Sequence, residues 1–582
     1  MLRTLLCLVM TASTAVAADS PKVGDTVGKL TFTDIRSLPR TLDDFGKNKA
    51  TVLVFTSTTC PLVKRYLPTL KELHKEYTGK GVQFAAVNAA DEDTLIQMAT
   101  QAVKFDVPFP FVKDFNGSCV DALGVKRTPE VVVLDAAKRI VYRGRIDDQF
   151  RLGGNRKEAT THELKDAIDA VLSGKAVAVA ETEVDGCPIT RAIPRKHENV
   201  NFAEHIAPIL KTHCWQCHRD GGSAPFSLTT FKSASTRAKA INEVIQDQRM
   251  PPWFASHDFG PFANVRGLTE NEKTILKDWA KTGTAAGDEA KMPAAPKATD
   301  AKWKIGEPDL VLKTTSMTVA ATGDIAYQYA ILPHLFTEDT WVKNVQILPD
   351  NPKVMHHCNM AWGNLAAGFS AKNFITGQVP NGEPMDLDPG VAVLIPKNSV
   401  LALEIHYVST GQPEKCRISV GLNYPKEPIQ RQLKSMQLES TRFAIPPGDP
   451  HFAVKQTRTL SSDADIVGLF SHMHLRGKDM TFTATTPDGK VDEMLIIANY
   501  NFGWQIPYRY EPGKKVLPKG TRLECVAHFD NSPFNPYNPD PKKTVRWGHQ
   551  THDEMMMGFV FYTDAGDKLN LNVDPKTGVA VK

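Results

Sequence analysis

The histidines of this chain gather in its C-terminal half, at spacings that suit metal binding. Ten of the 17 histidines follow residue 303. His472 and His474 are two residues apart, so on a β-strand both imidazoles would point to the same face. His356 and His357 are adjacent and would diverge on a regular strand, so they can share one metal ion only at a bulge or a strand end. Because imidazole is a common ligand for copper and zinc, these pairs predict a metal site.

Two further segments carry groups of the same kind. Along Leu401–Tyr407 the apolar residues alternate, so His406 and Glu404 share the opposite face of a strand. The run Asp553-Glu-Met-Met-Met557 leads into an apolar stretch typical of a strand. Its methionines either pack into a core or offer soft thioether ligands to Cu(I).

The elements that position these residues are predicted to be strands. Short runs rich in Val, Ile, Thr and aromatic residues, separated by Pro, Gly, Asn and Asp, fill residues 303–582. This pattern predicts all-β sandwich or jelly-roll sheets. A Pro- and Gly-containing stretch near 430–455 indicates a seam, so we expect two domains, at 303–440 and 441–582.

The order His-His, His-Tyr, His-x-His and Asp-Glu-Met resembles the copper type II ascorbate-dependent monooxygenases, which include peptidylglycine α-hydroxylating monooxygenase and dopamine β-hydroxylase. The resemblance implies two β-domains that each carry one copper and face each other across an open cleft. It assigns His356, His357 and His406 to the copper that transfers electrons. His472, His474 and Met555 would hold the copper that binds O2, with Met556 or Met557 as alternatives to Met555.

The chain departs from this family at its cysteines. Vertebrate members carry a cysteine where Met556 stands, and its disulfide partner matches Cys525, so this bridge is missing and Cys525 is expected to be free. Cys416 matches a family cysteine, and Cys358 directly follows the histidine pair. His528 is a candidate for a residue that is not itself a ligand but donates a hydrogen bond near the metal site.

A second kind of site is indicated by Cys214-Trp-Gln-Cys217-His218. Cys-x-x-Cys-His is the pattern for covalent attachment of haem c, in which the histidine binds the iron. A capping box at Asn201 and another at Thr269 predict flanking helices, so residues 195–287 resemble a small all-α cytochrome c. The alternatives for the cysteines are a disulfide or a zinc site completed by two of the histidines.

Met250 is the expected second axial ligand of this haem. It is the only methionine between His218 and Trp279. A thioether opposite imidazole raises the reduction potential and suits electron transfer. For the zinc alternative, the further ligands would be His213 and His257.

The N-terminal segment, 20–185, predicts an α/β layer with helices over a mixed sheet. Strands are expected at 51–55 and 82–87, helices at 61–77 and 91–105, and a hairpin at 131–142. Cys60 lies between the first strand and its helix, where the helix N-terminus favours a thiolate. With Thr128-Pro129 as a cis-proline loop, the segment resembles the thioredoxin and peroxiredoxin superfamily.

Val63 stands where a thioredoxin has its second cysteine, which argues against ordinary dithiol exchange. Cys60 is therefore either a peroxide-reducing residue, with Cys119 or Cys187 as its resolving partner, or a structural or disulfide-bonded cysteine. Runs of small residues at 174–183 and 282–302 predict linkers.

Composition and the N-terminus set the compartment and exclude some classes of partner. The net charge of the 582 residues is +4, which gives no reason to expect nucleic-acid binding. Arg3, an apolar run and Ala15-Val-Ala17 predict a signal peptide at 1–17, which removes Cys7 and directs the chain to the periplasm or outside the cell. No later stretch is long and apolar enough to span a membrane.

Together these observations predict an exported copper monooxygenase that hydroxylates a C–H bond with O2. Its expected cofactors are two copper ions and one covalent haem c. Its expected partners are a small-molecule or peptide substrate, and an ascorbate-like reductant or a periplasmic redox protein. The alternatives are a non-catalytic redox or copper-binding electron-transfer protein, and a thiol peroxidase led by the N-terminal domain.

Overall fold

The computed structural model describes residues 21–191, 197–222, 224–296, 302–323, 325–364, 371–379 and 382–581. Their contacts divide them into two compact units. Residues 21–34, 39–93 and 109–191 form the first, and the rest form the second. The expected signal peptide at 1–17 lies outside the described residues. Within the described ranges, no helix has the length and apolar character needed to cross a bilayer.

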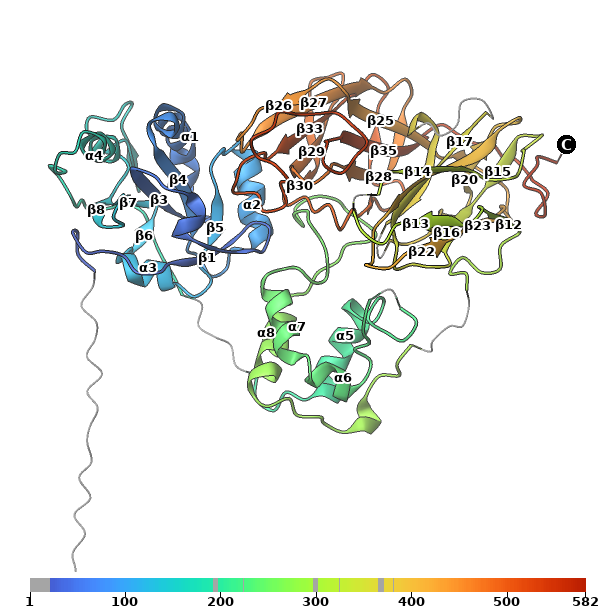
Figure 1. Ribbon diagram of the computed structural model, residues 1–582, viewed down its shortest axis with the longest axis horizontal. Coiled ribbons are helices and arrows are strands. Elements are labelled where there is room, and N and C mark those ends of the chain that lie inside the picture. Colours follow the sequence, from blue (N-terminus) through green and yellow to red (C-terminus); the bar gives the residue numbers. More distant parts are fainter. Residues whose placement is uncertain are drawn as a thin grey trace, which may run out of the picture. The chain divides into compact units, whose positions relative to one another are not determined.

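The first unit is built on a seven-stranded mixed sheet, as the sequence predicts (Figure 1). Its central strands are parallel, and the hairpin strands run antiparallel to them. The strand order is β2 (Pro39–Thr41), β1 (Thr31–Asp34), β5 (Phe111–Lys113), β4 (Val82–Asn88), β3 (Ala50–Thr56), β7 (Glu130–Asp135) and β8 (Ile140–Gly144). Its helices are α1 (Pro61–Tyr77), α3 (Ser118–Leu123) and α4 (Glu163–Leu172).

In the segment 174–183, predicted as a linker, residues 180–182 are instead hydrogen-bonded to the edge of this sheet. The backbone N–H of Arg143 donates to Ala180, and the N–H of Thr182 donates to Arg143. A short strand, β11 (Cys187–Pro188), then pairs with β6 (Arg127–Thr128). The small residues of this segment satisfy their backbone groups on a neighbouring strand, which composition alone does not reveal.

The helix expected at 91–105 begins later than predicted. As α2 (Leu95–Lys104), it starts after Thr94, whose side chain accepts a hydrogen bond from the Gln97 N–H in a capping box. By its contacts this helix belongs to the second unit, where Ala99 packs against Ile496 and Ala498.

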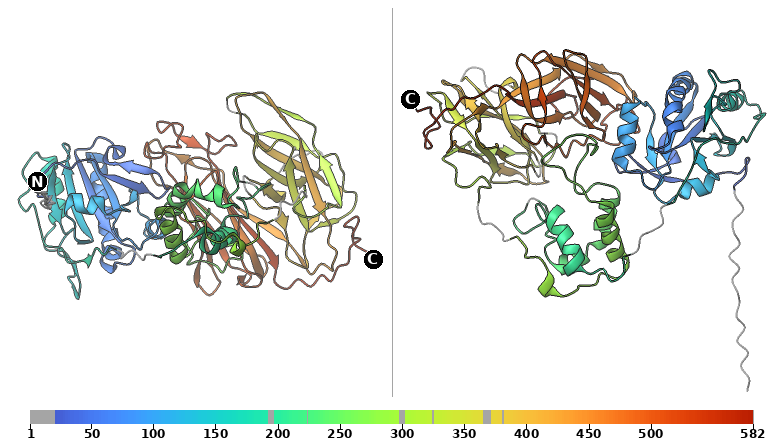
Figure 2. Two further views of the ribbon diagram at one scale, coloured as in Figure 1. Left: turned by 90° about the horizontal axis from the view of Figure 1, so that it is seen from below. Right: turned by 180° about the vertical axis from the view of Figure 1, so that it is seen from behind.

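Within the second unit, four helices and a π-helical turn at Phe202–Ile206 form one compact group (green in Figure 2). Trp215 and Trp279 are fully buried in its core. The two predicted helix starts are confirmed, since Asn201 accepts from Glu204 and Thr269 forms a capping box with Glu272. The helices are α5 (Ala207–His213), α6 (Phe231–Ser235), α7 (Ala238–Gln246) and α8 (Glu270–Lys281).

The remainder of the second unit is rich in β-sheet, as predicted, and has two separate cores. Around the first core lie β12 (Leu310–Lys313), β23 (Ile418–Asn423), β16 (Asn344–Pro349) and β19 (Met385–Asp386) in one sheet; β14 (Gln328–Ile331), β21 (Val400–Tyr407), β17 (Met355–Gly363) and β18 (Phe374–Gln378) in a second; β15 (Thr340–Val342), β20 (Val391–Ile395) and β24 (Arg431–Gln432) in a third; and the pair β13 (Met317–Val319) and β22 (Glu414–Cys416).

Around the second core lie β25 (Lys434–Ser440), β35 (Met556–Asp564), β28 (Ala464–His472) and β31 (Tyr508–Arg509), with β32 (Val516–Leu517) beside β28; β27 (Phe452–Thr459), β33 (Arg522–Phe529), β29 (Gly477–Thr485) and β30 (Val491–Ile497); and the pair β26 (Ala444–Ile445) and β34 (Val545–Arg546). We call these two parts the first and second β-domains.

Three segments belong to a different part of the second unit than the boundaries expected from the sequence imply. Residues 253–262, inside the predicted haem segment, contribute Trp253, Phe254 and Phe262 to the core of the second β-domain. β25 pairs with β35, so the second β-domain begins before residue 440. The last described residues return to the first β-domain, where Leu571 pairs with Ile429.

Candidate functional site

Three histidines converge on two adjacent strands of the first β-domain. His357 on β17 lies directly opposite His406 on β21, and the pairing register shifts between Met355 and His357. This shift is the bulge that the adjacent pair His356 and His357 was expected to need. One ligand atom of each of the three histidines lies within 4.8 Å of the others. The structure therefore brings these three residues together.

The surroundings of this cluster favour neutral imidazoles. Nδ1 of His356 lies 3.2 Å from Nδ1 of His357, and the Tyr327 hydroxyl lies 3.2 Å from Nε2 of His357. The Tyr327 ring stacks on His406 at 4.8 Å. Burial lowers the pKa of His357 well below its usual range, and the neighbouring His406 lowers it further. Neutral imidazoles that face one another have lone pairs available for a metal ion.

His472 and His474 are held by partners from other segments. β28 ends at His472, and the Tyr500 hydroxyl accepts from the N–H of Met473 and donates to its carbonyl oxygen. Nδ1 of His472 lies 2.8 Å from Oε1 of Gln505, and Nδ1 of His474 lies 3.2 Å from the carbonyl oxygen of Asp553. Both acceptors require the proton on Nδ1 and leave Nε2 as the lone-pair nitrogen.

This arrangement fits a metal ligand pair. Nε2 of His474 is buried and has no hydrogen-bond partner among the described residues. A buried polar atom without a partner is costly unless something else binds it. Histidine ligands commonly donate their other ring N–H to a carbonyl or carboxylate, as His472 and His474 do here.

The three consecutive methionines divide between two sides of their strand. Met555 and Met557 pack with Phe559 in one cluster, whereas Met556 is buried in the core of the second β-domain. Met557 lies opposite His472 in the pairing of β35 with β28. The geometry therefore leaves Met555 and Met557 beside the histidines and excludes Met556.

Glu554 ties the methionine segment to the histidine loop. Its buried carboxylate accepts the N–H of His474 at 2.9 Å and the N–H of Arg476 at 2.6 Å. Burial raises the pKa of Glu554 to about 8, although these hydrogen bonds oppose the shift. Met555 follows directly in the chain, so Glu554 fixes its position relative to His474.

One histidine of each group lines the same cavity of about 260 Å³. His357, His472 and Met555 all line it. The ring centroids of His357 and His472 are 6.3 Å apart, which is closer than the open cleft that the family resemblance implies. The Phe502 ring fills space between the groups, since it lies 5.3 Å from His356 and 5.9 Å from His474.

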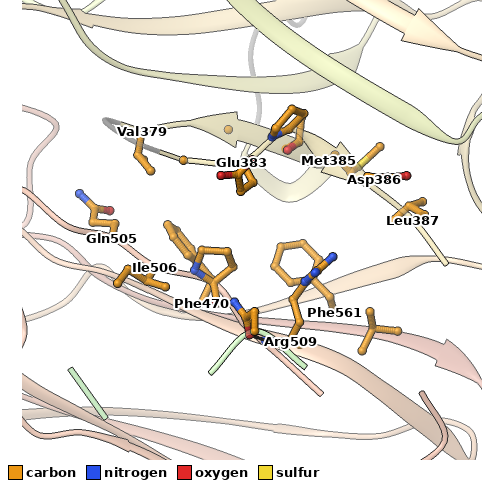
Figure 3. A pocket seen from close by; sticks show the side chains of 18 of the residues that line it. Val379, Glu383, Met385, Asp386, Leu387, Phe470, Gln505, Ile506, Arg509 and Phe561 are labelled. Atoms are coloured by element: carbon orange, nitrogen blue, oxygen red, sulfur yellow. Dashed lines mark hydrogen bonds between the residues drawn. The ribbon is translucent and has the colours of Figure 1, made fainter. Parts of the chain in front are cut away.

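A larger cavity of about 640 Å³ adjoins the first and shares lining residues with it, including Phe470 and Gln505. Its walls come from both β-domains (Figure 3). Glu383 lines one wall, and Arg509 and Phe561 line the other. The cavity therefore offers apolar surface together with charged groups of both signs.

His528 has a different role from the one expected. Its Nδ1 lies 2.6 Å from the Asp479 carboxylate, and its ring stacks on His451 at 4.1 Å. It does not line the cavity of the two histidine groups. His549 is nearer to them, because it pairs with Glu404 at 3.6 Å and lines that cavity.

The Cys-x-x-Cys-His motif follows α5 in a tight turn. The N–H groups of Cys217 and His218 both donate to the carbonyl oxygen of Cys214. Nδ1 of His218 lies 3.1 Å from the carbonyl oxygen of Phe226, which places the proton on Nδ1 and leaves Nε2 as the lone-pair nitrogen. These residues fit the attachment of a haem. Met250 lines a separate cavity of about 240 Å³ together with His257, and His218 is not among its lining residues.

Cys60 occupies the position that the sequence predicts, directly before α1. Pro61 is the first helical residue, and the Thr128–Pro129 peptide is cis. Burial disfavours the thiolate, but hydrogen bonds from the Cys187 thiol and the Val63 N–H outweigh it and lower the pKa of Cys60. All eight described cysteines are free thiols, including Cys525.

Alanine in place of Cys187 is expected to raise the pKa of Cys60, because it removes the hydrogen bond from the Cys187 thiol. In the wild-type chain, the pH midpoint for alkylation of Cys60 should lie below that of an ordinary thiol. The midpoint is measured by isotope-coded alkylation and mass spectrometry of the Cys60 peptide. An unchanged midpoint would contradict this role of Cys187.

Sequence reasoning missed four residues that position the others: Tyr327, Tyr500, Gln505 and Glu554. Of these, only Glu554 could have been found from the sequence, since it lies inside the Asp-Glu-Met segment. The contacts of the other three join residues 27 to 33 positions apart in the chain.

Comparisons with known proteins bear on the N-terminal part. Residues 22–159 match the family model of the redoxins. The thiol-disulfide oxidoreductase ResA of Halalkalibacterium halodurans is 30% identical over 95 residues, which is 16% of this chain and 53% of that protein. ResA of Bacillus thuringiensis subsp. konkukian is 26% identical over 120 residues, which is 21% of this chain and 68% of that protein. The chain thus spans about half the length of the first of these relatives and two thirds of the second.

Among solved structures, a hypothetical protein of Sinorhizobium meliloti 1021 is 30% identical, with 30% of this chain and 97% of that chain covered and a TM-score of 0.28. An uncharacterized conserved protein of Geobacillus kaustophilus is 28% identical, with 31% and 96% covered and the same TM-score. The family match and the mixed sheet show that the chain carries a redoxin-like, thioredoxin-like α/β domain at its N-terminus.

Proposed function

We propose that this chain is an exported oxidoreductase whose two β-domains form a copper monooxygenase. The reaction would place one oxygen atom of O2 on a C–H bond of a small molecule or peptide and reduce the other to water. His356, His357 and His406 would hold one copper ion. His472, His474 and Met555 would hold the second.

The observation that carries the proposal is that one histidine of each group and Met555 line one cavity. His357 comes from the first β-domain, and His472 and Met555 come from the second. All three line the same cavity of about 260 Å³. Segments this far apart in the chain therefore meet around one cavity. Ordinary buried histidines are satisfied by protein hydrogen bonds, whereas Nε2 of His474 has no such partner in the described part of the chain.

Copper bound at these groups would supply one-electron transfer and activation of O2. The residues of the chain prepare the site for it. Gln505 and the Asp553 carbonyl orient His472 and His474, and Glu554 fixes the distance between His474 and Met555. Phe470 and Phe559 line the cavity and keep water away from the reacting C–H bond.

The substrate would reach this cavity from the larger one beside it. That cavity can hold an apolar group against Phe470 and Phe561 and a charged group beside Arg509 or Glu383 (Figure 3). We therefore expect an amphipathic substrate with a polar or charged end.

Electrons would come from an ascorbate-like reductant, from a periplasmic redox protein or through a haem c in the helical part. Cys214 and Cys217 would bind that haem covalently, and His218 and Met250 would hold its iron, which would supply one-electron transfer. The hydrogen bond from Nδ1 of His218 to Phe226 supports the histidine in this role.

The haem assignment predicts that haem stays on the chain after denaturation. A denaturing gel stained for haem should show the wild-type band, and serine at Cys214 and Cys217 together should abolish it. Alanine at Met250 should keep the covalent haem but lose the thioether-to-iron absorption band of the oxidised protein. A stained band in the double serine variant would contradict the assignment.

The monooxygenase proposal is tested by metal analysis and labelled oxygen. The purified chain should bind two copper ions, and with a reductant and candidate amphipathic substrates it should give a product that contains one ¹⁸O atom from ¹⁸O₂. The variant His357→Ala should retain one copper and form no product. Copper binding without oxygen uptake would favour the alternative of a non-catalytic copper-binding electron-transfer protein.

For the N-terminal domain we propose thiol redox chemistry at Cys60. The redoxin match, the position of Cys60 at a helix N-terminus and its lowered pKa support this. The two relatives named above are thiol-disulfide oxidoreductases, which favours thiol–disulfide exchange over the peroxidase alternative.

A further inference from the structure

Cys187 lies beside Cys60 although the two are far apart in the chain. In the pairing of β11 with β6, Cys187 is directly opposite Thr128. The thiol of Cys60 donates to the carbonyl oxygen of the same Thr128 at 3.2 Å. Thr128 therefore contacts both cysteines, and the backbone of Cys187 crosses the loop against which Cys60 packs.

The approach of β11 to this loop depends on the residue before Cys187. A side chain at Gly186 would place its Cβ 2.5 Å from the Thr128 carbonyl oxygen, so any other residue would push the strand away. The Arg127 guanidinium donates to the carbonyl oxygen of Gly186 at 2.7 Å and holds it in place. The chain thus has specific contacts that bring Cys187 to Cys60.

The two thiols differ in exposure and acidity. Cys60 is only 2% exposed, whereas Cys187 is half-buried. Burial and the hydrogen bond with Cys60 raise the pKa of Cys187 to about 11, while the pKa of Cys60 is lowered. Cys60 is thus the better leaving group of the two, and Cys187 is the more accessible sulfur.

Cys119 does not provide an equivalent partner. It is fully buried and donates to the carbonyl oxygen of Thr31 at 3.4 Å. Burial raises its pKa to about 12. Val63, at the usual position of a second cysteine, has no sulfur.

We propose that Cys60 and Cys187 form a dithiol–disulfide centre, in which Cys187 is the sulfur that meets an external thiol or disulfide. The centre replaces a Cys-x-x-Cys pair by a cysteine on a separate strand. This inference rests on the proposed redox function of Cys60 and names its partner and its direction of attack.

The exchange balances without any further reactant. An external thiolate attacks Sγ of Cys187 in the oxidised pair, a mixed disulfide forms, and the Cys60–Cys187 bond breaks to release the Cys60 thiolate. A second thiol of the same external dithiol then attacks the mixed disulfide and releases Cys187, which takes up a proton. The external dithiol is oxidised by two electrons, and the pair is reduced by two. The reverse sequence reduces an external disulfide.

The test uses the full chain and 5,5′-dithiobis(2-nitrobenzoate), a symmetric aromatic disulfide, with each cysteine followed by peptide mass spectrometry. In the wild type, we expect two equivalents of aromatic thiol from this pair and a cross-linked Cys60–Cys187 peptide. The variant Cys60→Ser should release one equivalent and keep a stable adduct on Cys187. Serine at Cys119 is the matched control and should behave as the wild type.

The outcomes distinguish a failure of the Cys60–Cys187 pairing from a failure of the proposed redox function of Cys60. If wild-type Cys60 carries a stable adduct or forms a disulfide with Cys119, the proposed Cys60–Cys187 pairing is wrong, but the proposed redox function of Cys60 stands. If Cys60 reacts in Cys187→Ser as fast as Cys187 does in the wild type, entry through Cys187 is wrong. If Cys60 does not react in any form of the chain, the proposed redox function fails as well. The wild-type cross-link needs no variant, so the test does not depend on the folding of a mutant.

Discussion

Leucine in place of Met555 is expected to abolish oxygen-dependent product formation, whereas leucine in place of Met556 is expected to leave it unchanged. The two substitutions are chemically identical at neighbouring positions. Met555 lines the cavity with His472, but Met556 lies in the core of the second β-domain. Only the first change removes a soft ligand from the proposed copper site.

The expected loss at Met555 is at least about 100-fold in kcat/KM, since changes even outside the ligand set of a metal cost about 10–100-fold. Met556→Leu conserves volume and should cost less than about 1.5 kcal/mol of stability. Product formation is measured under ¹⁸O₂, with copper content determined on the same samples. Equal activity of the two variants would overturn the assignment of Met555, and Met557→Leu then tests the other methionine that lines the cavity.

Alanine in place of Glu554 is expected to destabilise the chain by about 2–6 kcal/mol. The change removes the acceptor of two buried N–H groups, those of His474 and Arg476. Each unsatisfied buried donor costs about 1–3 kcal/mol. Urea denaturation of the full chain measures the loss, and the His474 loop should become accessible to protease before the remaining parts unfold.

The matched controls are Glu554→Gln and Glu439→Ala. Glutamine keeps one side-chain oxygen as an acceptor, so about half of the loss should be restored. Glu439 lines the cavity beside Met555 but is only half-buried, and its replacement should cost about 0.5 kcal/mol or less. A loss at Glu439 as large as that at Glu554 would show that the effect comes from the cavity in general.

Local patterns in the sequence predicted the parts of the fold that depend on neighbouring residues. The buried strand before Cys60, the helix α1 that begins at Pro61 and the capping box at Thr269 are all where the sequence places them. The bulge at His357 also followed from local reasoning, because adjacent histidines cannot share one face of a regular strand.

Contacts between distant segments could not be predicted from local patterns in the sequence. The run 174–183 has the composition of a linker, but its backbone pairs with Arg143. The carboxylate of Glu554 acts on backbone N–H groups 78 and 80 residues away, and such contacts leave no spacing in the sequence. The pairing of Cys187 with Thr128 belongs to the same class, which is why the sequence named Cys187 only as one of two candidates.

The return of the chain's last described residues to the first β-domain restricts how the two β-domains can move. The polypeptide leaves the first β-domain after β24, which ends at Gln432, and comes back by Leu571, which exchanges both backbone hydrogen bonds with Ile429. Two paired connections restrict the relative rotation of two domains more than a single connection does. The domains that carry the two histidine groups are therefore joined by two neighbouring segments of the chain instead of one.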